Sequence, residues 1–486
     1  MNGAMIRARD AALRLLTWTP KRALSRWLLG GALAAALCAL LLGVNYASGA
    51  LSNLNDIGTW QNRLIFLVLS AMAQGLLLLL VTALHRGSYA RLALRELVMT
   101  AGYYIQLMAI NQKAYAFVEA TRPLVRAMDA GGLSAAAGLG TNLSSPALTL
   151  LYAVTRGPIY DMYMVKLLCV LALCALAAFV MGWADRNGAG IRAEVVLALC
   201  LILPQGFMSA ACAAQLDVVC VALLAAAYTC VTAKRAHPVA GAVLYGLACA
   251  MSGLALYALP VCALLMKKRT LRPAHLAISA LVAVGCCVPA VLAGQSVTDA
   301  LLSLVRANTG IPEYATGAPH VFSIFPRYAA EEMPEYFILK HLPEIDTVKN
   351  ASPYYTEQGF RLIMRGMALA CLALYGMAVA CLGGRRGMSG TAKALTLSLI
   401  ACLLCPGATA GAWLLPCMIG MLAIVTEPRL RLPACAVIFA TAGAAVYPVT
   451  GEILLPMVVA AALCTLSALG LLGLFDGLRE EAARRG

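Results

Sequence analysis

Charged residues are scarce in this sequence, at 12% of 486 residues, and only 22 residues are acidic. Soluble globular proteins have about a quarter of their residues charged, so this composition excludes a soluble globular fold. The chain also lacks a G-x-x-x-x-G-K-[ST] loop, a G-x-S-x-G turn and an H-E-x-x-H helix, which excludes the commonest signatures of nucleotide binding, serine hydrolysis and zinc proteolysis. It contains no repeat, heptad pattern or low-complexity segment.

Apolar residues make up 62% of the chain, and the mean hydropathy is +0.82. Apolar runs of roughly 16 to 24 residues recur between short polar breaks, and this is close to the length that a helix needs to cross a bilayer. Such runs differ from the alternating pattern of a membrane barrel. The sequence therefore predicts an all-α polytopic membrane protein with about 12 to 14 transmembrane helices.

Fourteen apolar segments are candidate spans. They lie at residues 28–44, 64–84, 96–110, 163–181, 195–210, 218–231, 239–251, 253–266, 276–292, 362–382, 395–405, 410–425, 432–447 and 454–474. Segments 239–251 and 253–266 are too short for two full crossings, so we expect two short or tilted helices with a break at Ser252 and Gly253. Segment 96–110 carries several polar side chains and predicts a helix that faces the bundle or lies at the interface.

Topology explains the net charge of +15 better than nucleic-acid binding does, and no nucleic acid is expected as a partner. Basic residues gather in alternate connections, at 85–95, 185–192, 234–235, 267–272, 385–386 and 429–431. By the positive-inside rule these connections face the cytoplasm. We predict a multi-pass protein of the bacterial cytoplasmic membrane with both termini inside. It comprises a basic arm over 1–27, a transmembrane domain over 28–475 and a tail over 476–486.

Under this topology the long polar segments 111–161 and 294–361 lie on the outer side. Loops that a rigid scaffold positions often carry function, so we place the site at the outer membrane boundary. In the first loop, residues 112–128 predict a surface helix whose apolar side includes Tyr115, Val118 and Val125. Ser145 is expected to cap a short helix that begins at Pro146.

The eighteen cysteines lie almost all within apolar runs and are interpreted as small buried residues. The C-x-x-C at 402–405 has no second pair and no nearby histidine. The acidic cluster at Glu331, Glu332 and Glu335 has no spacing typical of metal ligands. Neither a metal nor a cofactor is predicted.

Gln215 and Asp217 lie between segments 195–210 and 218–231, which contain no carboxylate. A carboxylate inside a membrane costs roughly 2.5 to 3.5 kcal/mol on insertion scales, which favours a functional role. The alternative is structural, because Asp217 directly precedes Val218 and can cap a helix or bond to a neighbouring helix.

Several segments resemble motifs of the bacterial GT-C glycosyltransferases, in particular the group related to the mannosyltransferases of GPI-anchor synthesis. Residues 144–152, with Pro158 and Tyr160, are similar to the family's Tyr-Pro-Pro motif. Residues 214–217, Ala-Gln-Leu-Asp, resemble its Gly-Gln-x-Asp, and residues 317–322 resemble an Asn-Ala-Pro-Asn-Leu-Trp type segment. Together these matches cover residues 111–326.

The resemblance implies a GT-C-like helix bundle that moves a sugar, such as the hexose mannose, from a polyprenyl-phosphate donor to an acceptor on the extracytoplasmic side. It implies an acidic general base in the first outer loop and basic groups that hold the lipid phosphate. The partners expected on this basis are a polyprenyl-phosphate-linked sugar and membrane lipid. The candidate substrate-binding residues are Gln215, Lys113, Arg122, Arg126, Tyr152, Arg156, His320 and Arg327.

The sequence departs from the family pattern at the general base. Lys113 stands where the family has aspartate, and the late His-Glu-Arg-Tyr type motif is absent from 406–413. Three interpretations remain open. In the first, another acid is catalytic, with Asp217, Asp56 and Glu119 as candidates. In the second, the chain is a non-catalytic member that binds a lipid-linked saccharide. In the third, it is a lipid or solute transporter whose cavity uses Asp217.

Overall fold

All regular secondary structure in the computed structural model is helical over the residues that it describes. These residues are 23–48, 60–85, 87–139, 143–157, 159, 161–190, 192–233, 235–309, 318–320, 357–384, 388–405, 409–450 and 457–473. Most of the predicted N-terminal arm and the whole predicted C-terminal tail lie outside them. The predicted class, an all-α polytopic membrane protein, is confirmed.

Six helices among the described residues are long and apolar enough to cross a membrane, and one bent helix pair makes a seventh candidate. Seven further apolar helices have 10–17 residues. Each of the fourteen predicted segments contains a helix. How many of these helices cross the membrane stays a prediction.

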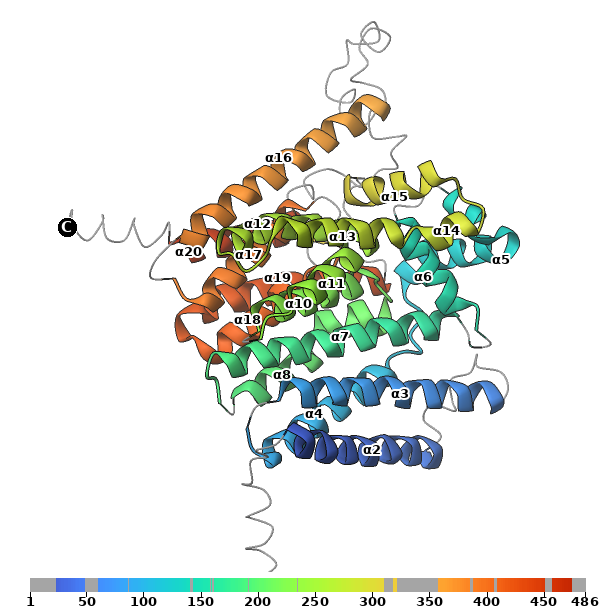
Figure 1. Ribbon diagram of the computed structural model, residues 1–486, viewed down its shortest axis with the longest axis vertical. Helices are drawn as coiled ribbons and strands as arrows, with labels where there is room; N and C mark the ends of the chain where they lie inside the picture. Colours follow the sequence, from blue (N-terminus) through green and yellow to red (C-terminus); the bar gives the residue numbers. More distant parts are fainter. Residues whose placement is uncertain are drawn as a thin grey trace, which may run out of the picture. The chain divides into compact units, whose positions relative to one another are not determined.

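The helices form two compact units. Unit 1 comprises Met1–Lys113 and Val154–Ala214, and unit 2 comprises Ala114–Ala153 and Gln215–Gly486. The helices of unit 1, drawn in blue to green in Figure 1, are α2 (Ala23–Ser48), α3 (Trp60–Leu84), α4 (Tyr89–Met108), α7 (Asp161–Arg186), α8 (Arg192–Ile202), α9 (Pro204–Gly206) and the π-helical turn η2 (Phe207–Cys212).

Within unit 1, α3 packs against both α2 and α7, and Figure 1 shows these three helices side by side. α7 is apolar around its whole circumference and mostly buried, as expected for a helix at the centre of a bundle. α2 instead exposes large apolar side chains such as Leu28 and Leu40, which suits a helix that faces lipid. α4 buries its polar side chains against the bundle, which confirms the bundle-facing alternative for segment 96–110.

The candidate span 195–210 is a bent pair of helices in the structure. The helix ends at Ile202, bends by 43° and resumes at Pro204. Proline has no backbone N–H and its ring clashes with the preceding turn, so an α-helix breaks there. The chain then forms the π-helical turn η2 before it reaches Ala213 and Ala214.

An ion-pair network joins two connections that were both predicted to be cytoplasmic. Arg95 Nε donates to Glu194 Oε1 at 2.8 Å and Arg95 Nη1 donates to Asp185 Oδ2 at 2.7 Å. Arg91 pairs with the same two carboxylates. Arg95 is fully buried, so its charge requires both partners. The two connections therefore lie at the same end of unit 1, as the predicted topology requires.

Lys166 of α7 is buried and ties α7 to the chain that follows α4. Its ammonium group donates to the carbonyl oxygens of Ile110, at 2.9 Å, and Gln112. The carbonyl groups of Ile110 and Gln112 follow the end of α4, where carbonyl groups lack partners within the helix, and the lysine ammonium group satisfies them. This contact fixes the backbone just before Lys113.

Unit 2 combines long helices with several short helices and turns. In chain order they are the π-helical turn η1 (Phe117–Thr121), α5 (Arg122–Ala137), most of α6 (Ser145–Thr155), α10 (Asp217–Thr232), α11 (Pro238–Met251), η3 (Gly253–Ala258), α12 (Leu259–Lys267), α13 (Pro273–Gly285), α14 (Val288–Leu292), α15 (Val297–Thr309), α16 (Glu357–Gly384), α17 (Gly390–Leu404), α18 (Leu414–Thr426), η7 (Pro428–Leu430), α19 (Arg431–Thr450) and α20 (Met457–Leu471). α11 packs against α10 and α13. The predicted break at Ser252 and Gly253 is confirmed.

The first outer loop contains a helix, as predicted. Of the residues on its predicted apolar side, Val125 is buried in the protein and Tyr115 and Val118 are exposed, while Phe117 is buried as well. The π-helical turn η1 has more residues per turn than an α-helix, so it rotates the residues before it relative to those after it. A second irregularity follows at Gly132, whose φ of 72° kinks α5.

Gly30 allows α2 to approach α3 closely. A Cβ atom at this position would lie 2.6 Å from Thr82 Oγ1, whereas a Cβ at Gly31 would meet nothing within 4 Å. We expect Gly30→Ala to lower the free energy of unfolding by about 1 to 3 kcal/mol through overpacking. Gly31→Ala is the matched control and should be neutral or stabilising, because alanine favours the helix. Denaturation in detergent measures both, and equal effects of the two substitutions would contradict this packing.

His85 makes the stability of unit 1 depend on pH. Arg95 Nη1 lies 3.1 Å from His85 Nδ1, and burial together with the Arg95 cation lowers the pKa of His85 to about 4. An unfolded histidine titrates near pH 6.5. Between about pH 6.5 and pH 4 the unfolded state binds the additional proton, so this stability is present above the window and is lost as the pH falls.

We expect thermal unfolding to shift to lower temperature between about pH 7 and pH 5, by the equivalent of about 2 kcal/mol. His85→Gln should remove this part of the pH dependence. His237→Gln, at an exposed histidine outside unit 1, should leave it intact. An unchanged pH profile in His85→Gln would show that His85 is not the titrating group.

Candidate functional site

Asp217 is the first residue of α10, and two hydroxyl groups hold its carboxylate. Thr409 Oγ1 donates to Asp217 Oδ2, and the Ser252 side chain also bonds to this carboxylate. Ser252 is the residue at the break between α11 and η3. Leu216 is the N-cap of α10. Asp217 is therefore not the helix cap, whereas the other part of the structural alternative, a bond to neighbouring segments, is confirmed, because Asp217 links three segments of unit 2.

Two tight backbone features surround this carboxylate. A Cβ at Gly411 would lie 3.2 Å from Gln215 Oε1 and 3.4 Å from Asp217 Cβ, so the turn that carries Thr409 approaches Gln215 closely. Ala214 has a φ of 56°, a left-handed conformation that residues other than glycine rarely adopt. Ala214 occupies the first position of the segment that resembles Gly-Gln-x-Asp.

The left-handed backbone at Ala214 predicts a stabilising substitution. Its Cβ costs about 1 kcal/mol in this conformation, so Ala214→Gly should raise the free energy of unfolding by up to that amount. Ala213 has a φ of −87° and provides the matched control, because Ala213→Gly should be neutral or destabilising. Thermal unfolding of both variants in detergent tests this, and a loss of stability in Ala214→Gly would contradict it.

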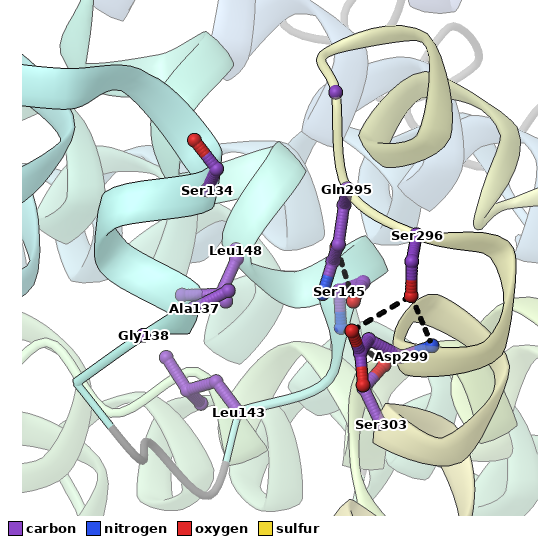
Figure 2. A pocket seen from close by; sticks show the side chains of 11 residues that line it. Ser134, Ala137, Gly138, Leu143, Ser145, Leu148, Gln295, Ser296, Asp299 and Ser303 are labelled. Carbon is purple, nitrogen blue, oxygen red and sulfur yellow. Dashed lines mark hydrogen bonds between the residues drawn. The ribbon is translucent and has the colours of Figure 1, made fainter.

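A cavity of about 360 Å³ lies in unit 2, at the end of α5 and the starts of α6 and α15 (Figure 2). We call it the Ser145 pocket. Most of its polar groups are hydroxyls, with one amide and one carboxylate. It is lined by Ser134, Ala137, Gly138, Leu143, Ser145, Leu148, Gly294, Gln295, Ser296, Asp299 and Ser303.

The two serines of the Ser-Ser-Pro motif have different tasks. Ser144 Oγ accepts a hydrogen bond from the backbone N–H of Ala147 at 3.2 Å and donates to the carbonyl of Ala250. Ser144 is thus the helix cap, one residue before the predicted Ser145. Because Ser145 is released from capping, its Oγ donates to Gln295 Oε1 at 2.8 Å and its N–H donates to Ser303 Oγ at 2.8 Å.

Asp299 is the carboxylate in the pocket wall. Ser296 Oγ donates to Asp299 Oδ2 at 2.7 Å and accepts from the Asp299 backbone N–H at 3.0 Å. The Ser296 hydroxyl thus caps the first turn of α15 and also fixes the orientation of the Asp299 carboxylate. Sequence analysis missed Asp299, although the Ser-x-x-Asp pattern before an apolar helix was a detectable signal.

The Ser145 pocket and Asp217 are braced by the same end of α11. Ser144 bonds to the carbonyl of Ala250, and Ser252, two residues further along, bonds to Asp217. The segments that resemble family motifs in the first outer loop and at 214–217 are therefore connected through one short piece of backbone. The outer-loop segment 144–152 belongs to unit 2, and so do residues 215–217 of the second segment.

The other predicted site residues lie apart from the pocket lining. Lys113, Glu119, Arg126 and Arg156 are exposed, Arg122, Tyr152 and Gln215 are half-buried, and Asp56 and Arg327 lie outside the described residues. His320 is buried, and burial lowers its pKa to about 4, so its ring is neutral near pH 7. Lys113 and Arg156 belong to unit 1. Their roles stay predictions.

No protein-family model matches the chain, and no curated protein or solved structure matches it either. The likeness to GT-C glycosyltransferases therefore depends on the sequence motifs alone. Across the described part of the chain, no three side chains of His, Cys, Asp or Glu are grouped so that they could hold a metal ion. The Ser145 pocket offers hydrogen-bond donors and acceptors and a single anionic group, which suits a neutral ligand with several hydroxyls.

Proposed function

We propose that this protein is a GT-C-type membrane glycosyltransferase that moves a hexose from a polyprenyl-phosphate donor to an acceptor hydroxyl on the extracytoplasmic side. The Ser145 pocket carries the proposal. It contains part of the Ser-Ser-Pro segment that resembles the family, and its hydroxyl and amide groups match those of a sugar. Its volume of about 360 Å³ is within the range of small-molecule sites.

Asp299 is the proposed general base. Its carboxylate lies at the pocket and is oriented by Ser296. In the proposed step the acceptor oxygen attacks the anomeric carbon, the carboxylate takes the acceptor proton, and the bond between sugar and phosphate breaks to release the polyprenyl phosphate. A general base in such a step contributes about 100- to 10,000-fold.

Asp217 has a positioning role in this proposal. Its carboxylate is already bonded to Thr409 and Ser252, and these bonds hold the turn before α18 against the end of α11. Since Ser144 bonds to the same end of α11, this arrangement also supports the wall of the Ser145 pocket.

Binding without transfer is the second candidate function, and Lys113 favours it. This residue is exposed and stands where the resemblance expects the catalytic acid. A lysine cannot take the place of that carboxylate, so the chain either uses another acid, for which Asp299 is our candidate, or transfers no sugar.

The experiment is binding of a short-chain polyprenyl-phosphate hexose to the purified full-length protein, followed by native mass spectrometry. We expect Ser145→Ala to weaken binding about tenfold, because one hydrogen bond in a buried site is worth about 1 kcal/mol or more. Thr149→Val is the matched control, since it removes a hydroxyl of the same helix that donates to the Ser145 carbonyl and does not line the pocket. The lipid-sugar proposal would be overturned if the unsubstituted protein and both variants bound only phospholipid, and bound it equally.

Transfer is then measured by release of polyprenyl phosphate in membranes that contain acceptors. Asp299→Asn should reduce the rate by about 100-fold or more and leave donor binding unchanged. Binding without release in the unsubstituted protein would select the non-catalytic function. Movement of the intact lipid across a vesicle bilayer, without cleavage, would favour the transporter alternative.

A further inference from the structure

A line of buried polar side chains runs between α3 and α4 in unit 1. Three hydrogen bonds connect the two helices, and we call them the α3–α4 polar ladder. They run from Thr82 Oγ1 to Glu96 Oε1 at 2.8 Å, from Gln74 Nε2 to Thr100 Oγ1 at 3.1 Å, and from Tyr103 OH to the Ser70 carbonyl at 2.9 Å.

The spacing along each helix explains the ladder. Ser70, Gln74 and Thr82 are separated by four and eight residues, so they share one face of α3. Their partners follow in the reverse order on α4, because the two helices are antiparallel. All the side chains of the ladder are buried, and polar groups inside a helical membrane bundle commonly mark a functional path.

Beside each of these three hydrogen bonds, one buried polar atom has no partner in the described part of the chain. These atoms are Ser70 Oγ, Gln74 Oε1 and Glu96 Oε2. A buried polar atom that forms no hydrogen bond costs about 1 to 3 kcal/mol, so three of them on one helix interface indicate a ligand that bonds to them. Small buried polar sites of this kind usually hold water.

The charges around Glu96 are already balanced. On α4, Arg91 and Arg95 pair with Asp185 of α7 and Glu194 of α8, which makes two cations against two anions. His85, which follows α3, is neutral near pH 7 because burial and Arg95 lower its pKa to about 4. No cation of this network is left to neutralise an ionised Glu96.

The remaining neighbour of Glu96 is α2. A Cβ at Gly30 would lie 3.3 Å from Glu96 Oε1, so the carboxyl group faces the backbone of α2. Two groups on α2 can carry charge there, and each is directed to a backbone carbonyl. Arg26 donates to the His85 carbonyl at 3.4 Å, and the thiol of Cys38 donates to the Ala71 carbonyl at 3.5 Å. Among the described residues the ion pairs of this region involve Arg91 and Arg95 only, so Arg26 does not pair with Glu96.

We propose that Glu96 is a proton-binding site. Its Oε1 accepts the hydrogen bond from Thr82, and its Oε2 carries a proton that it donates to a water molecule held at the α3–α4 polar ladder. The ligand is thus a proton together with bound water. Release of the proton places an unpaired negative charge against α2, so proton binding holds α2 against α3 and α4. This site belongs to unit 1 and is independent of the Ser145 pocket.

Infrared spectroscopy of the full-length protein in lipid at about pH 7 tests the site. The spectrum of the unsubstituted protein minus that of Glu96→Gln should contain the carbonyl stretch of one protonated carboxyl group. Glutamine has the same size and can still accept the bond from Thr82. Asp299→Asn is the control and should leave this band in place, because Asp299 is exposed. Absence of the band from the Glu96 difference spectrum would overturn the proposal.

The variant Thr82→Val tests the same carboxyl group and does not depend on whether Glu96→Gln folds. Thr82→Val removes the hydroxyl that donates to Oε1, so the carbonyl stretch should move to higher frequency without loss of intensity. An unmoved band would show that the signal comes from another carboxyl group. Transfer into D₂O should also shift the band within minutes, and a band that does not exchange would exclude the bound water.

Discussion

The lipid interior offers no hydrogen-bond partner to a polar group, and this constraint shapes every polar feature of the protein. It requires each segment to satisfy its own backbone, which is why the regular structure described is helical throughout. It also requires buried side chains to find partners on other helices. Arg95 meets two carboxylates, Lys166 meets two carbonyl groups, and Asp217 meets two hydroxyls.

Breaks in the helices bring the candidate site together. The kink at Gly132 sends the end of α5 toward the pocket, and the break at Ser252 presents a hydroxyl to Asp217. Helix interiors use their polar backbone groups internally, so only breaks and ends leave groups that can bind a ligand or a second segment. The Ser145 pocket accordingly lies at the end of α5 and the starts of α6 and α15 (Figure 2).

The two proposed sites differ in what holds them. The Ser145 pocket depends on groups at helix ends, where solvent reaches the exposed Asp299. The α3–α4 polar ladder lies inside unit 1, where balanced ion pairs leave Glu96 without a counter-charge. The first site therefore suits the proposed sugar, which offers several hydroxyl groups, whereas the second suits the proposed proton and water.

The sequence alone determined the class of the protein, because long apolar runs admit only membrane helices, and the serine and glycine at 252–253 marked one of the breaks. It also singled out Asp217 and the Ser-Ser-Pro segment as candidates for a site. Only the tertiary structure decided which partners those residues have. Thr409 lies far from Asp217 in the chain, and Gln295 lies far from Ser145. The balance of charge around Glu96 likewise depends on several helices, and no local pattern records which side chains of separate helices meet.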